Sequence, residues 1–128
     1  MDPPPLPDGV LLQSVHVDDR GRKGGWRVWA DGRHEGRSVG EADWQAGPAI
    51  DAAGLDEIQA ILDDAGLDAM AGVHRPEAPA EHESALWFQA ARPGCPPVTV
   101  GLLDGARLPG LDRLVARLAP ILSGGALP

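Results

Sequence analysis

Apolar and polar residues alternate in four short runs of the chain, at 10–17, 25–30, 84–92 and 98–102. This period of two is typical of β-strands that bury one face. In the second run Trp26, Val28 and Ala30 share one face, whereas Arg27 and Trp29 share the opposite one. The sequence therefore predicts four strands whose two sides differ in character.

A further strand is predicted over 33–39, after the tight-turn pair Asp31-Gly32. Its residues are mostly polar and charged, which favours the edge of a sheet. The segments 18–25, 41–48, 73–83 and 93–97 are polar or rich in glycine and proline. We interpret these four segments as loops.

Two segments repeat their apolar residues at the spacing of an amphipathic helix. The first carries Leu55, Ile58, Leu62 and Ala65 and ends at Gly66, a residue type that often follows a helix C-terminus. The second begins near Pro109 and carries Leu111, Leu114, Val115, Leu118 and Leu122 on one stripe.

The predicted order of elements is β-β-β-α-β-β-α. Short turns between consecutive strands imply antiparallel pairing. The expected fold is α+β, a two-layer sandwich with an antiparallel sheet of about five strands and two helices on one of its faces. Residues 1–9 form an extended, proline-rich lead-in, and residues 10–128 form a single α+β domain.

Composition narrows the classes of partner. The formal net charge of −8 argues against nucleic acid, which is bound mainly by neutralising phosphates. No apolar run approaches the ~20 residues needed to cross a membrane. The N-terminus lacks the features of a secretory signal, so a soluble, cytoplasmic protein is expected unless a signal segment has been removed. The preference for arginine over lysine suggests a bacterial source.

The charge is unevenly distributed along the chain. Six of the eleven basic residues lie between Arg20 and Arg37, whereas residues 41–83 contain a single cation, Arg75. One interpretation is a solvated surface that keeps the protein soluble. The other is a basic hairpin that steers the molecule towards an oppositely charged partner.

Catalytic chemistry is not evident. The best cluster of metal-ligand types contains His74, Glu77, Glu81, His82 and Glu83, but it lies in a proline-broken loop and lacks a helical His-x-x-x-His spacing. The sequence thus predicts no catalytic residue, no metal site, no cofactor and no enzyme activity. The one cysteine, Cys95, is expected to be buried or inert.

Tryptophan is the most informative residue type. Four of the five aromatic residues are tryptophan, and each needs a large pocket and a partner for its N–H group. They either complete the core or provide a binding anchor, since Trp and Arg are enriched at interface hot spots. The candidate binding residues are Trp26, Arg27 and Trp29, together with Arg22 on the basic hairpin and Trp87.

Several features along the chain resemble one known family. They are Gly24-Gly25, the segment from Leu55 to Leu62, Glu83 with Trp87, Val98-Val100-Asp104, and Pro109-Leu111-Leu114-Leu118. In this order they resemble the emfourin-type family, small bacterial proteins that inhibit thermolysin-like metalloproteases. The resemblance implies a two-layer α+β fold and a metalloprotease partner, but it assigns no contact residues here.

The leading hypothesis is a non-enzymatic protein-binding module, of a protease-inhibitor-like kind, that uses the basic hairpin containing Trp26 and Trp29. The alternative is a structural or assembly component that self-associates through the open face of the sheet. A metal-dependent enzyme is a distant third hypothesis.

Overall fold

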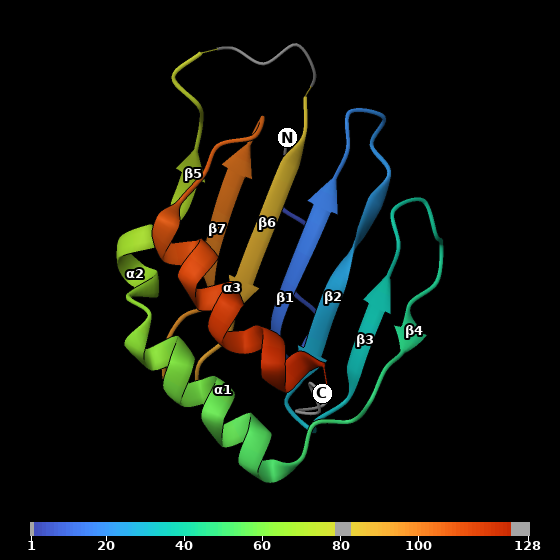
Figure 1. The fold of residues 1–128 in the computed structure, drawn as a ribbon, viewed down its shortest axis with the longest axis vertical. Coiled ribbons are helices and arrows are strands. Elements are labelled where there is room, and N and C mark those ends of the chain that lie inside the picture. The colour runs from blue at the N-terminus through green and yellow to red at the C-terminus, as the bar shows by residue number, and fades with distance from the viewer. Residues whose placement is uncertain (1, 79–82, 124–128) are drawn as a thin grey trace.

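The protein is described by a computed structural model that covers residues 2–78 and 83–123. Its elements are β1 (Val10–Val17), β2 (Lys23–Trp29), β3 (His34–Arg37), β4 (Gln45–Ala46), α1 (Ala52–Asp64), α2 (Leu67–Met70), β5 (Gly72–His74), β6 (Ala85–Ala90), β7 (Val98–Leu103) and α3 (Pro109–Leu122). Figure 1 shows them arranged as one sheet with helices packed across it.

The seven strands form a mixed sheet in the order β4-β3-β2-β1-β6-β7-β5. All neighbours are antiparallel except β5 and β7, which are parallel. The central strand β1 pairs with both β2 and β6, and seven of its eight residues are buried. A strand this deeply buried needs cover on both faces of the sheet.

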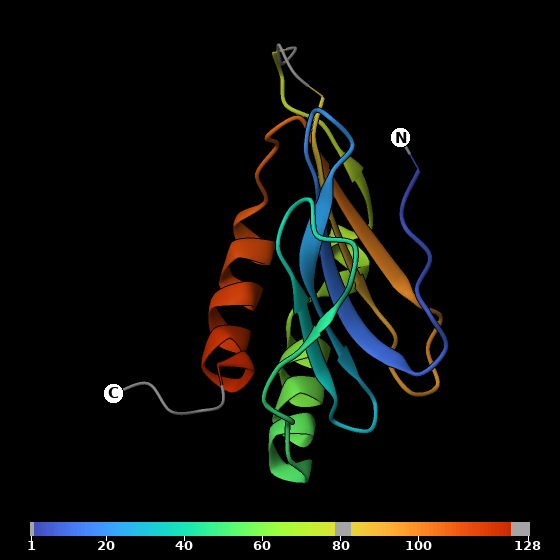
Figure 2. The ribbon, with the colours of Figure 1, turned by 90° about the vertical axis from the view of Figure 1, so that its right-hand side faces the viewer.

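Helices α1 and α3 lie on the same side of the sheet, as the side view shows (Figure 2). The main core lies between these helices and what we call the helix face of the sheet. It contains Leu12, Val28, Phe88 and Val100 from the strands, with Ile58, Leu62, Leu114 and Leu118 from the helices. Trp26 packs against this core, with its ring at 6.3 Å and 72° from that of Phe88.

Local signals set the helix ends. Asp51 caps α1, because its carboxylate accepts a hydrogen bond from the backbone N–H of Gly54 at 2.8 Å. Gly66, two residues after the end of α1, adopts a left-handed φ of 71° that favours glycine. The turn returns the chain to α2, whose Leu67 and Met70 are buried in the core.

The α+β class and the largely antiparallel sheet are confirmed, whereas the strand count and the order of elements were predicted wrongly. Strands β4 and β5 form within segments interpreted as loops, and β4 displaces β3 from the edge of the sheet. The added elements, including α2, have two to four residues, too few for a detectable period. Helix α1 also begins earlier than expected, at Ala52.

The second face of the sheet, opposite α1 and α3, has its own cover. The N-terminal residues 2–7 have no regular secondary structure and run along this face (Figure 2). A smaller apolar cluster of Val15, Val17, Ala85, Trp87 and Leu103 is buried there. The second face therefore combines a covered part over β1, β6 and β7 with a more open part over β2 and β3.

Candidate functional site: an arginine–tryptophan ladder

Strand alternation places a set of charged and aromatic side chains on the open part of the second face. On β2, Arg27 and Trp29 point away from the core that holds Trp26 and Val28. On β3, Glu35 is the cross-strand partner of Arg27, and Arg37 is the partner of Gly25. The sequence alternation therefore separates the apolar and the charged sides of these two strands.

Five of these side chains form an alternating stack, which we call the Arg–Trp ladder: Arg33, Trp29, Arg27, Trp44 and Arg37. The guanidinium carbon of Arg33 lies 4.2 Å from the ring centre of Trp29, and that of Arg27 lies 5.1 Å from the same ring. Arg27 also lies 4.2 Å from the ring of Trp44, and Arg37 lies 4.6 Å from it. Each contact is within the range of a cation–π interaction, ~6 Å.

Glu35 holds the centre of the ladder. Its Oε1 atom accepts a hydrogen bond from the indole N–H of Trp29 and another, at 2.8 Å, from Nε of Arg27. The hydrogen bond from Trp29, followed by the hydrogen bond and charge of Arg27, lowers the pKa of Glu35. Glu35 therefore stays ionised, and it fixes the orientation of both neighbours.

The side chains of the ladder differ in exposure along its length. The side chains of Arg27 and Glu35 are only 16% and 23% exposed, whereas that of Arg33 is 62% exposed and pairs with Asp31. At the other end, Nε of Arg37 is buried without a hydrogen-bond partner among the described residues. Nε of Arg27 and Nε of Arg33 already donate to Glu35 and Asp31. Each guanidinium has five N–H donors, so its Nη groups are the donors that match a further carboxylate.

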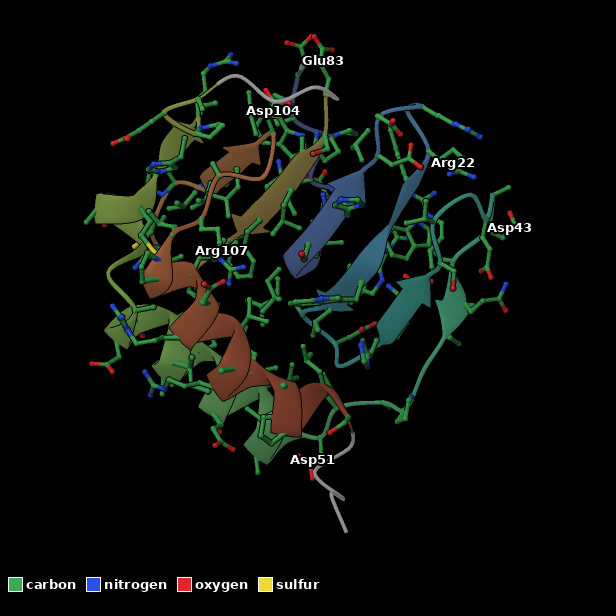
Figure 3. The ribbon with its side chains drawn as sticks, turned by 45° about the horizontal axis from the view of Figure 1, so that its top comes forward. Arg22, Asp43, Asp51, Glu83, Asp104 and Arg107 are labelled. Atoms are coloured by element: carbon green, nitrogen blue, oxygen red, sulfur yellow. The ribbon has the colours of Figure 1, made fainter. Side chains whose placement is uncertain are left out.

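The five predicted binding residues do not form one site. Arg27 and Trp29 are both in the ladder. Trp26 packs on the helix face, and Trp87 is buried on the second face with 1% of its surface exposed. Arg22 lies at the β1–β2 hairpin (Figure 3), where it pairs with Asp18 at 2.8 Å.

The sequence prediction missed Trp44, Arg33, Arg37 and Glu35. Strand alternation places Arg33, Glu35 and Arg37 at every second position, so their shared face was readable from the sequence. Trp44 gave no such signal, because it lies in the connection between β3 and β4 and reaches the ladder only when that connection folds back.

Other chemistry considered in the sequence gains no support. Glu81 and His82 of the candidate metal cluster lie outside the described residues, and His74 Nε2 lies 2.8 Å from the carbonyl oxygen of Met70. Within residues 2–78 and 83–123, no three potential ligands gather to hold a metal ion. Cys95, expected to be buried or inert, is exposed in its turn. None of the described helices is long and apolar enough to span a membrane.

The chain matches no protein-family model, no curated protein and no solved structure. The resemblance to emfourin-type inhibitors is therefore untested.

Proposed function

We propose that this protein is a non-enzymatic protein-binding module that contacts its partner through the Arg–Trp ladder. The observation that carries the proposal is the alternation of three guanidinium groups and two indole rings on an accessible part of the sheet. Arg and Trp are the residue types most enriched at interface hot spots. The stack holds them in place before binding, which reduces the entropy that binding would cost.

The chemistry of the ladder favours a partner that presents carboxylates. The molecule as a whole carries a formal charge of −8, so a local cluster of three arginines is a distinct basic area on an acidic protein. Such a difference in charge orients two proteins during encounter. A metalloprotease remains one proposed partner, supported only by the resemblance of sequence features, and self-association remains the alternative.

The first test compares three baits in affinity capture from cell lysate and medium, read by mass spectrometry. The baits are the wild type, a ladder variant with Arg33→Gln and Arg37→Gln, and a control variant with Arg107→Gln and Arg113→Gln. Both variants lose two charges, but Arg107 and Arg113 are exposed residues at α3, away from the ladder. Circular dichroism checks that all three baits are folded.

We expect the wild type and the control variant to capture the same partner, and the ladder variant to lose it. The captured partner would then be titrated directly, and a thermolysin-like protease would be assayed for inhibition in parallel. Equal capture of the same proteins by all three baits would contradict a role for the ladder. Recovery of the bait protein alone would favour the assembly hypothesis.

A further inference from the structure

The covered part of the second face has the chemistry of a peptide-binding site. Residues 3–7, which we call the proline segment, contain four prolines and one leucine. Proline fixes φ near about −65° and lacks an N–H group, so such a segment favours the extended polyproline II conformation. Its carbonyl oxygens are then its main means of hydrogen bonding.

Two glutamine side chains of the sheet donate hydrogen bonds to these carbonyl oxygens. Nε2 of Gln13 donates a hydrogen bond to the carbonyl oxygen of Pro5 at 3.0 Å, and Nε2 of Gln89 donates to that of Pro4 at 2.9 Å. Gln13 on β1 and Gln89 on β6 are direct cross-strand partners, joined by a hydrogen bond of 2.7 Å. Two adjacent carbonyls of the proline segment thus meet two adjacent amides of the sheet.

The glutamines are unusual for their position. Their exposed fractions are 2% for Gln13 and 5% for Gln89. Val15 and Trp87 lie two residues away on the same face, and Thr99 on β7 is the cross-strand partner of Gln89. Burying an amide in apolar surroundings is unfavourable unless it is hydrogen-bonded, and an apolar residue would fill the same space without this cost. The two proline carbonyls satisfy these amides, together with the hydrogen bond between the glutamines and Thr99 Oγ1, 3.5 Å from Nε2 of Gln89.

Trp87 is the aromatic residue of the buried cluster on the second face. It lies two residues from Gln89 on the same face, and it is fully buried with Val15, Val17 and Leu103. Its indole Nε1 has no hydrogen-bond partner among the described residues. Proline-rich ligands dock in aromatic-lined grooves, so an aromatic residue beside the two glutamines suits such a ligand.

We propose that this part of the second face is a binding site for a proline-rich peptide of a partner protein, in the polyproline II conformation. In the isolated chain, the proline segment occupies the site as a tethered competitor. It is attached through Gly9, whose φ of 88° turns the chain into β1, and whose carbonyl binds the N–H of Ala30 at 2.7 Å. This site is separate from the Arg–Trp ladder, and its test does not depend on the ladder.

A tethered segment competes at an effective concentration in the millimolar range, so it weakens the apparent affinity for any peptide added in trans. The test therefore uses the full chain in two forms, the wild type and a variant with Pro3→Gly, Pro4→Gly and Pro5→Gly. The probe is a fluorescein-labelled peptide with the sequence of residues 2–9, read by fluorescence anisotropy. A peptide in which glycine replaces all four prolines is its control.

We expect the variant to bind the proline peptide at least about tenfold more tightly than the wild type does, and to ignore the glycine peptide. In the variant background, Gln13→Leu with Gln89→Leu is expected to weaken binding at least about tenfold. Gln45→Leu with Gln59→Leu is the matched control, because these residues lie on β4 and α1. The proposal would be overturned if the variant bound the proline and glycine peptides equally, or if Gln13→Leu with Gln89→Leu did not weaken binding.

A second measurement uses the wild type, so it does not depend on whether the variants fold. In the wild type, excess proline peptide carrying a nitroxide spin label is expected to broaden the NMR signals of the Gln13 and Gln89 side-chain amides and the Trp87 indole. Unchanged signals would overturn the proposal. So would a wild-type dimer, seen by light scattering, that dissociates when the prolines are replaced, because a second copy would then be the occupant.

Discussion

The indole ring of Trp87 lies directly against Gly101, its cross-strand partner on β7. A Cβ atom at position 101 would lie 2.4 Å from Cζ3 of the ring, far inside van der Waals contact. Glycine therefore provides the space in which the largest residue of the buried cluster on the second face is accommodated. The lack of a side chain at Gly101 is therefore what allows the ring of Trp87 to pack on β7.

Gly101→Ala is expected to destabilise the protein by about 1–3 kcal/mol, because the ring must move from a packed site. Urea unfolding followed by circular dichroism measures the change in free energy. Gly36→Ala is the control, since the nearest atom to its added Cβ would lie at 3.8 Å, an ordinary contact. A similar small effect of both substitutions would contradict the packing argument.

Trp44→Ala is expected to destabilise the fold by about 1–2 kcal/mol, because it removes the stacking of both Arg27 and Arg37 at roughly 0.5–1 kcal/mol each. Thermal unfolding of a double-mutant cycle with Arg37→Gln isolates their coupling, expected to be about 0.5 kcal/mol or more. Trp44→Ala combined with Arg107→Gln should give additive changes. Additivity in the Arg37 cycle as well would show that the ladder is not coupled.

Asp51→Ala should lower the free energy of unfolding by about 1 kcal/mol, because the N–H of Gly54 then loses its capping acceptor. Asp51→Asn and Asp51→Ser retain a capping oxygen and are expected to preserve most of the stability. Chemical denaturation followed by circular dichroism measures the difference. A loss with Asn as large as that with Ala would point to the charge of Asp51 rather than to the cap.

His34 gives the fold a pH dependence. Burial lowers the pKa of His34 below its ordinary value of 6.5, although a hydrogen bond with the backbone of Pro48 opposes this shift. The unfolded chain therefore binds the proton more readily, and the free energy of unfolding should fall as the pH decreases from about 7 towards about 5. In the variant His34→Gln this slope should flatten, whereas His16→Gln, at an exposed position, should retain it.

Much of the fold was predictable because its longer elements bury one side with a regular period. The stripe of Leu111, Leu114 and Leu118 identified α3, and the alternation of Val98, Val100 and Leu102 identified β7. The short strands β4 and β5 were not predictable in this way. They pair with β3 and β7 at the two edges of the sheet, and each is too short to show a period.

The candidate site was predictable only in part. Alternation showed that Arg27 and Trp29 share a face and that Trp26 lies on the other, but it could not show which face is covered by helices. The contribution of Trp44 depends on a chain reversal between β3 and β4, a long-range feature with no local pattern. Likewise, nothing local connects Gln89 with Pro4, which lie 85 residues apart.

The two outermost strands also determine how another chain could approach the sheet. The edge strands are short: β4 has two residues and β5 has three. Each edge of the sheet therefore offers only a short row of backbone donors and acceptors. Pairing with a strand of another chain, as in β-augmentation or fibril growth, is favoured by a longer and flatter edge strand. Short edge strands hinder edge-to-edge association of sheets. This is consistent with our proposal that a partner binds through side chains on a face of the sheet.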